Sequence, residues 1–191
     1  MDHIDLSQYI RDIPDFPQPG VLFKDITTLL KHPVAFRHAI DRLAEPFQGS
    51  GVDIVVGMES RGFIFAAPLA YQLGAGFVPV RKMGRLPAES VKVSYDLEYG
   101  HNTLEIHRDA IRPGQRVLVV DDLLATGGTV LATIKLVEQL QGTVVGLAFL
   151  IELLYLNGRK NLKELNNQPP IVSLIQYERP EPAPALRQTP D

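Results

Sequence analysis

Several features that define common protein classes are missing from this chain of 191 residues. It contains no cysteine, which excludes disulfide bonds, cysteine nucleophiles and cysteine metal ligands, and which suits a reducing compartment. No apolar run is long enough to cross a bilayer, and the first residues lack the basic and apolar segments of a secretory signal. We therefore expect a cytoplasmic protein without a membrane partner.

A surplus of basic residues is also missing. The formal net charge is −3, whereas proteins that bind the nucleic-acid backbone usually carry a basic surplus or stripe, so no nucleic-acid partner is expected. There are no internal repeats. The five histidines are scattered and lack the spacing of metal ligands. They are His3, His32, His38, His101 and His107. With 45% hydrophobic and 21% charged residues, the chain has the composition of one globular domain.

What remains is an alternation of strand-like and helix-like segments. Four apolar runs predict strands that are buried on both faces. They cover residues 53–57, 76–80, 116–120 and 144–151. Apolar residues at helical spacing predict helices between them. These are Phe36, Ile40, Leu43 and Phe47; Phe63, Ala67, Ala70 and Leu73; and Val130, Ile134, Val137 and Leu140. Gly142 is placed to end the last helix. The alternation predicts a doubly wound α/β fold with a mainly parallel sheet.

A different pattern occupies the middle of the chain. From Val91 to Leu97 apolar and polar residues alternate strictly, and Leu104 and Ile106 repeat the alternation after Gly100. This predicts an antiparallel hairpin inserted after the second strand of the sheet. We expect one domain over residues 1–178, with the hairpin inside residues 82–107. The proline-rich tail, residues 179–191, is expected to be disordered.

The most informative segment covers residues 116–129, which read RVLVVDDLLATGGT. We expect the sheet to end at Asp121, which places Asp121 and Asp122 at the edge where open α/β sheets bind ligands. The glycine-rich turn that follows leads into a helix, whose N-terminus can bind an anion. The turn consists of Ala125, Thr126, Gly127, Gly128 and Thr129. Carboxylates beside a phosphate site make electrostatic sense if they face hydroxyl groups, so the segment predicts a site for a phosphorylated ribose.

This segment resembles the phosphoribosyl-pyrophosphate (PRPP) signature of the type I phosphoribosyltransferases, in the form found in the adenine phosphoribosyltransferases. It is neither a Walker loop nor a dinucleotide fingerprint. Further blocks resemble the same family in the same order. They are residues 16–27, 59–63, 80–82, 84–87, 95–100 and 174–178. The resemblance implies the type I phosphoribosyltransferase fold, with residues 82–107 as a flexible hood over the site. For the turn alone, a plain strand-to-helix connector is the alternative.

The resemblance also implies how PRPP is bound. Asp121 and Asp122 would bind the ribose hydroxyls, and the turn at residues 125–129 would hold the 5-phosphate. Pyrophosphate would be bound by a loop that often contains a cis peptide and by a group of cations, some of which would reach the neighbouring subunit of a homodimer. This set consists of Glu59, Ser60, Arg61, Arg81, Lys82 and Arg85. Met83 stands where relatives often carry a polar or basic residue. The alternatives are a helix cap at Ser60 and a solvated basic loop.

Base binding is implied for the N-terminal segment, residues 1–30. Leu22 would supply main-chain hydrogen bonds to adenine, Phe23 would stack on the ring, and Lys24 takes a place where related enzymes often have arginine. Glu98 would be the catalytic residue, because the matching glutamate of the family contacts N7 of the purine and can act as a general acid or base. Without the resemblance, Phe23 would be a core residue and Glu98 a solvated residue at a hairpin tip.

The expected reaction is adenine plus PRPP giving AMP and pyrophosphate, a step of purine salvage, through an oxocarbenium-like transition state. Mg²⁺ would be held mainly by PRPP and pyrophosphate, without a dedicated protein cage. Two alternatives remain: a phosphoribosyltransferase for a 6-oxopurine, and a non-catalytic regulator that binds PRPP. Residues 16–27 favour adenine, and the chain shows no basic helix-turn-helix of the kind that such regulators normally attach.

Overall fold

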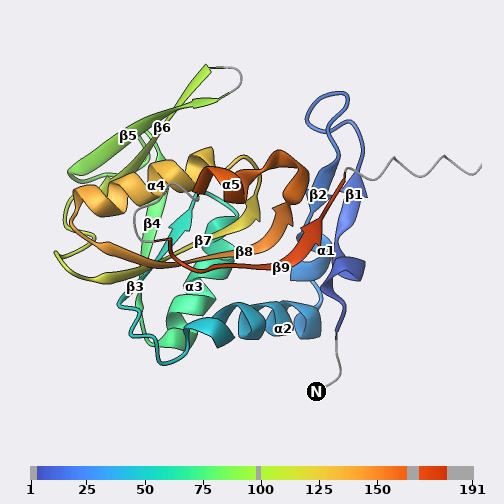
Figure 1. Ribbon diagram of the computed structural model, residues 1–191, viewed down its shortest axis with the longest axis horizontal. Coiled ribbons are helices and arrows are strands. Elements are labelled where there is room, and N and C mark those ends of the chain that lie inside the picture. The colour runs from blue at the N-terminus through green and yellow to red at the C-terminus, as the bar shows by residue number, and fades with distance from the viewer. Residues whose placement is uncertain (1–3, 98–99, 163–167, 180–191) are drawn as a thin grey trace, which may run out of the picture.

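The computed structural model describes residues 4–97, 100–162 and 168–179, and its main feature is a sheet of seven strands (Figure 1). The strand order is β5-β6-β4-β3-β7-β8-β9. The five strands from β4 to β9 in this order are parallel. Their bounds are Ile54–Met58 for β3, Gly76–Lys82 for β4, Arg116–Leu124 for β7, Thr143–Leu153 for β8 and Ile171–Tyr177 for β9. This confirms the predicted doubly wound, mainly parallel α/β fold.

Helices cover both faces of the sheet (Figure 1). One face carries α1 (Thr27–Leu30), α2 (Pro33–Ala44) and α3 (Gly62–Leu73), and the other carries α4 (Gly128–Gln139) and α5 (Gly158–Leu162). The central strand β7 serves both layers because its side chains alternate: Leu118 and Val120 pack in the core under α2 and α3, whereas Val119 packs in the core under α4. Short 3₁₀ turns complete the layers: η1 (Leu6–Tyr9), η2 (Glu45–Phe47) and η3 (Leu154–Leu156).

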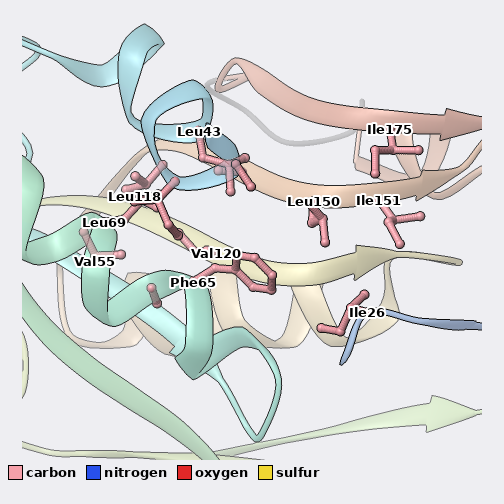
Figure 2. Close-up of a cluster of buried hydrophobic side chains, with 14 of the residues drawn as sticks. Ile26, Leu43, Val55, Phe65, Leu69, Leu118, Val120, Leu150, Ile151 and Ile175 are labelled. Atoms are coloured by element: carbon pink, nitrogen blue, oxygen red, sulfur yellow. The ribbon is translucent and has the colours of Figure 1, made fainter. Parts of the chain in front are cut away.

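Figure 2 shows the core on the α2 and α3 face. Leu43 from α2, Leu69 from α3 and Leu118 from β7 meet there and are fully buried. Burial of each such side chain contributes about 1.5–3 kcal/mol. This packing holds the carboxyl ends of β3 and β7 in a fixed relation, and the candidate site is built on those ends.

The predicted hairpin is present and extends the main sheet. It consists of β5 (Ser90–Leu97) and β6 (Gly100–His107), which are antiparallel, and β6 joins the end of β4 through the pairs Arg81 with Glu105 and Lys82 with Leu104. Val93 and Leu104 are buried in the core that includes α4, as their alternation predicts. The hairpin therefore packs against α4 and does not form a detached lobe (Figure 1).

The prediction that the sheet ends at Asp121 is wrong. Strand β7 runs on to Leu124, because β8 continues to pair with it beyond the acidic residues: Asp121 lies opposite Phe149, and Leu124 lies opposite Glu152. Both carboxylates therefore project from a paired strand. Their backbone is fixed by the sheet and not by a loop.

The expected end of α4 at Gly142 also needs correction. The left-handed residue that ends the helix is Gln141, with φ 62°, and the helix itself ends at Gln139. The N–H of Gly142 bonds to the carbonyl of Val137 at 3.0 Å and that of Gln141 to Glu138 at 2.9 Å, which is the Schellman pattern. Phe47, expected in the first helix, lies in η2 beyond the end of α2.

Some elements were not predicted. A second sheet of two antiparallel strands, β1 (Arg11–Ile13) and β2 (Phe23–Asp25), lies in the N-terminal segment, and β9 adds an edge to the main sheet. Strands of three residues are too short to show a period. The domain bounds and the disorder of residues 179–191 stay predictions, and all but one residue of that tail lie outside the described ranges. Within the ranges that are described, no helix has both the length and the apolar character needed to cross a membrane.

Candidate active site

The two adjacent carboxylates of β7 lie against the start of α3. Asp122 is buried, and its Oδ2 is 2.9 Å from Nε of Arg61, the residue that precedes α3. Asp121 is partly exposed, and its Oδ1 accepts a hydrogen bond from the backbone N–H of Asp122 at 2.9 Å. A Cβ atom on Gly62 would lie 2.9 Å from the same oxygen. The first turn of α3 can approach the carboxylates only because residue 62 is glycine.

The environment disfavours a negative charge on either carboxylate. Burial, and then the charge of Asp122, raise the pKa of Asp121 well above its usual range. Burial also raises the pKa of Asp122, although the guanidinium of Arg61 opposes that shift. Hydrogen-bond donors such as sugar hydroxyls would favour the ionised forms. The pair is thus suited to a ligand that brings such donors.

The glycine-rich turn forms the N-terminus of α4, as predicted. Gly127 is its N-cap residue and has φ 87°, a conformation that favours glycine. Over the described part of the chain no side chain caps this helix end, so its first N–H groups are available to an anion. From the hairpin, the hydroxyl of Tyr95 lies 3.1 Å from Oγ1 of Thr129. The alternating sequence pattern puts Tyr95 on one face of the hairpin but does not connect it with the turn.

Of the residues predicted to bind pyrophosphate, Arg81, Lys82 and Arg85 lie at the end of β4 or in the loop after it. Arg81 is held by Glu59, with Nη2 to Oε1 at 3.0 Å, and donates from Nη1 to the carbonyl of Arg85 at 3.0 Å. The hydrogen bond from Arg81 lowers the pKa of Glu59. Glu59 thus holds the side chain of Arg81 in place. Lys82 and Arg85 are exposed at the end of β4 and in the loop after it.

The loop between β3 and α3 contains the peptide that the resemblance implies. The bond between Glu59 and Ser60 is cis. The N-cap residue of α3 is Arg61, without a side-chain cap, so the alternative that makes Ser60 the helix cap is wrong. Arg61, the residue after Ser60, therefore stands beside the carboxylates of β7 through its ion pair with Asp122.

Glu105 on β6 was missed, although it shapes the loop that carries Arg85. It is only 2% exposed, and its Oε1 accepts hydrogen bonds from the backbone N–H groups of Arg85 at 2.8 Å and Leu86 at 3.0 Å. Burial alone would raise the pKa of Glu105, but these hydrogen bonds outweigh it and the pKa is lowered. In the alternating hairpin pattern Glu105 falls on the solvent face, and nothing in the sequence indicates that a loop covers it.

A cavity of about 300 Å³ opens next to the carboxylates. Leu22, Phe23 and Lys24 form part of its wall, as expected of a base pocket, and Arg61 is shared with the carboxylate pair. The other lining residues are Gly20, Val21, Leu123, Leu153, Tyr155 and Leu156. Leu123 of β7 and the residues of β8 and η3 were not predicted. The guanidinium of Arg61 lies 5.1 Å from the ring centroid of Phe23.

Lys24 does not direct its charge into open solvent. Its ammonium is buried, lies 2.7 Å from Oδ1 of Asp12 and sits over the ring of Tyr177, 3.7 Å from the centroid. These contacts tie β2 to β1 and to β9. The side chain of Lys24 therefore anchors the segment that carries Leu22 and Phe23. The block at residues 174–178, noted for its resemblance, supplies the aromatic part of this anchor.

Other predicted residues cannot be placed. Glu98, and its neighbour Tyr99, lie outside the described residues, so the catalytic role of Glu98 stays a prediction. In the described ranges, no three or more histidine, aspartate or glutamate side chains gather in a way that could hold a metal ion. The site thus combines an apolar cavity, a pair of carboxylates and a helix end without a side-chain cap along one edge of the sheet.

Comparison with known proteins gives a consistent result. The family model of the phosphoribosyl transferase domain matches residues 25–180. The adenine phosphoribosyltransferase of Thermobifida fusca (strain YX) is 62% identical over 160 residues, which is 84% of this chain and 91% of that protein. The crystal structure of adenine phosphoribosyltransferase from Rhodothermus marinus DSM 4252 is similar with a TM-score of 0.85 and 56% identity, covering 90% of this chain and 96% of that one. That of Saccharomyces cerevisiae, complexed with an imino-altritol bisphosphate and adenine, has a TM-score of 0.81 and 42% identity, with coverage of 88% and 96%.

Proposed function

The chain belongs to the phosphoribosyl transferase family, and from this premise we propose that it is the enzyme that converts adenine and PRPP into AMP and pyrophosphate. The observation that carries the proposal is the cavity walled by Leu22, Phe23 and Lys24, which shares Arg61 with the carboxylate pair of β7. A base in the cavity would thus lie next to a ribose at the carboxylates. The names and the high identity of the relatives support adenine as that base.

PRPP is proposed to bind along the carboxyl edge of the sheet. Asp121 and Asp122 accept hydrogen bonds from the ribose hydroxyls, since ionised carboxylates are acceptors only. The 5-phosphate binds the N–H groups of residues 125–129 at the start of α4. The pyrophosphate extends toward the cations at the ends of β3 and β4. Support comes from the uncapped helix end beside the carboxylates.

In the reaction the bond between C1 of the ribose and the pyrophosphate oxygen breaks, and N9 of adenine forms the new bond to C1. Positive charge grows on the ribose in the transition state, and negative charge grows on the departing pyrophosphate. Arg61 and the exposed Lys82 and Arg85 stabilise the second charge. As the N9–C1 bond forms, the imidazole ring loses a proton; Glu98 accepts it from N7 as a general base, and in the reverse direction donates it to N7 as a general acid. This role rests on the resemblance of residues 95–100 to the family.

Selectivity for adenine follows from readout by the main chain. Adenine presents an N6 donor beside an N1 acceptor, which one carbonyl and one N–H of Leu22 can match. A 6-oxopurine reverses this pattern and would leave buried polar groups unpaired, at a cost of about 1–3 kcal/mol each. The position of Leu22 in the wall of the cavity supports this readout.

Magnesium is proposed to accompany PRPP. Mg²⁺ prefers oxygen ligands, retains several waters and commonly binds through substrate phosphates. The described side chain that fits this chemistry is that of Asp121, an oxygen donor on β7 in a residue that is partly exposed. When bound, the ion supplies positive charge to the pyrophosphate. The remaining ligands would be oxygens of PRPP and water.

We also propose that the enzyme acts as a cytoplasmic homodimer. Helix α3 is apolar on both its buried and its outward side, where Ile64 is 36% and Tyr71 is 91% exposed, and Phe77 of the adjoining β4 is 38% exposed. A helix that is apolar all round is normally covered on both sides. A second copy of the chain would cover this face and bring its cations toward the first site. A reducing compartment suits the cysteine-free composition.

The first prediction concerns the substrate. Purified protein mixed with PRPP, Mg²⁺ and one of adenine, hypoxanthine, guanine or xanthine is expected to release pyrophosphate with adenine, at a rate at least about 100-fold above that with any 6-oxopurine. Chelation of Mg²⁺ is expected to stop the reaction. Product with hypoxanthine but not with adenine would point to a 6-oxopurine enzyme. PRPP binding without turnover on any purine would point to a regulator.

The raised pKa of Asp121 should make sugar binding depend on pH. Because sugar hydroxyls bind the ionised carboxylate, ribose 5-phosphate is expected to bind more tightly as the pH rises through that pKa, and binding is expected to release protons. Calorimetry without Mg²⁺, in two buffers of different ionisation enthalpy, measures the number of protons released. The variant Asp121→Asn should release fewer. Equal release from both proteins would show that Asp121 does not titrate on binding.

A further inference from the structure

The anion-binding turn is backed by a short helix that plays no part in the roles described above. The backbone of Gly158, the first residue of α5, packs directly against the turn: a Cβ atom on Gly158 would overlap the carbonyl oxygen of Ala125. In the other direction, a Cβ atom on Gly127 would lie 3.1 Å from the carbonyl oxygen of Gly158. Two segments that are distant in the sequence thus meet backbone to backbone, and glycine is needed on both sides.

Asn161, also in α5, makes a specific contact with the turn. Its Nδ2 donates a hydrogen bond of 2.8 Å to the carbonyl oxygen of Thr126. That carbonyl shares a planar trans peptide with the N–H of Gly127, and in such a peptide the two groups point in opposite directions. When Asn161 holds the carbonyl on the side of α5, the N–H of Gly127 points away from α5. Asn161 therefore fixes the direction of one of the donors proposed to hold the 5-phosphate.

Helix α5 is itself fastened to the sheet. Arg159 donates from Nε to Oε1 of Glu152 at 2.9 Å and from Nη1 to the carbonyl of Ile171 at 3.1 Å. Glu152 on β8 is only 2% exposed, and its Oε2 also accepts a hydrogen bond from the hydroxyl of Ser173 at 2.7 Å. The link joins α5 to two strands. A charged pair with this many partners holds a defined position.

We propose that α5 is a positioning element for the 5-phosphate turn, with Asn161 and Gly158 as its positioning residues. Neither residue has to touch the substrate: Asn161 orients the peptide between Thr126 and Gly127, and Gly158 allows the close approach. The inference rests on the proposed function, because it assigns the turn to the 5-phosphate. It goes beyond that function by giving residues 158–161 a part in PRPP binding.

The test separates the two ends of PRPP by using ribose 5-phosphate and pyrophosphate as separate ligands. Asn161→Ala is expected to weaken the binding of ribose 5-phosphate about five- to tenfold, which is the effect of about one hydrogen bond. The affinity for pyrophosphate should stay within twofold of the wild-type value. Gly158→Ala should weaken the binding of ribose 5-phosphate further, because the added Cβ atom would overlap the carbonyl of Ala125 and the turn would have to move. In turnover assays KM for PRPP should rise by a similar factor for Asn161→Ala, with kcat and KM for adenine within twofold.

The control is Lys160→Ala, which removes an exposed side chain of the same helix. This control tests for a general effect of lost positive charge, which would weaken the binding of ribose 5-phosphate and of pyrophosphate equally. The proposed effect of Asn161→Ala is confined to ribose 5-phosphate. Because Asn161 is exposed, its alanine variant should keep the wild-type melting temperature. Unchanged affinity for ribose 5-phosphate in both the Asn161 and Gly158 variants would overturn the inference alone. A wild-type protein that does not bind ribose 5-phosphate at all would overturn the proposed function together with it.

Discussion

Replacing Asp121 and Asp122 together with asparagine is expected to weaken PRPP binding by about 100-fold or more while the protein remains folded. Each carboxylate is proposed to accept charge-assisted hydrogen bonds from the ribose hydroxyls, and such bonds contribute about 1.5–3 kcal/mol each. Losing two of them corresponds to a factor of about 10² to 10⁴ in affinity. Titration calorimetry with PRPP and Mg²⁺ measures the change directly.

The same variant should not lose stability. The pKa values of both carboxyls are raised in the folded protein, so their ionisation disfavours the fold, and stability is lost as the pH rises from their unfolded pKa through the folded one. At neutral pH asparagine removes this cost, while Arg61, with a side chain that is 37% exposed, can still be hydrated. The melting temperature should therefore stay level or rise.

The matched control for the aspartates is Asp109→Asn, which changes an exposed aspartate outside the site. It should leave both PRPP affinity and melting temperature unchanged. If the double variant bound PRPP as tightly as the wild type, the assignment of the ribose to β7 would be wrong. If it failed to fold, the carboxylates would be structural residues and not binding residues.

The second large effect is expected at Glu98. Glu98→Ala should lower kcat by about 10² to 10⁴, the usual contribution of a general acid or base, and Glu98→Gln should lower it nearly as much because an amide cannot exchange the proton. The affinity for PRPP should stay within about twofold, since this residue is proposed to act on the base. Single-turnover kinetics at saturating PRPP and adenine separates the chemical step from product release.

A matched control for Glu98 is Glu138→Gln, which alters an exposed glutamate near the end of α4. It should keep the wild-type rate. An unchanged rate for Glu98→Gln would eliminate the proton-transfer role. A loss confined to Glu98→Ala would leave Glu98 as a residue that only positions the base.

The fold could be predicted because its central strands carry an unambiguous signal. Residues 117–120 are apolar without alternation, and the strand they form is buried on both faces in the sheet. The hairpin was predictable for the opposite reason, since Val93 and Leu104 alternate with polar neighbours and are buried on one face. In both cases the local pattern and the tertiary environment agree.

The rest depends on contacts between segments that are distant in the sequence. Strand β7 continues past Asp121 only because β8 pairs with it, and Glu105 is buried only because the loop at Arg85 and Leu86 covers it. Gly158 and Asn161 carry no pattern at all, since their importance comes from the backbone of the turn they meet. Local periodicity contains no information on such neighbours.

The position of Arg61 means that the two substrates cannot be treated as independent ligands. This one guanidinium pairs with Asp122 at 2.9 Å, approaches the ring of Phe23 and lines the cavity proposed for the base. A molecule that occupies the cavity and another that occupies the ribose corner both change the surroundings of the same charge. Their binding free energies are therefore coupled, and an inhibitor that joins both halves will not have the affinity obtained by adding its fragments.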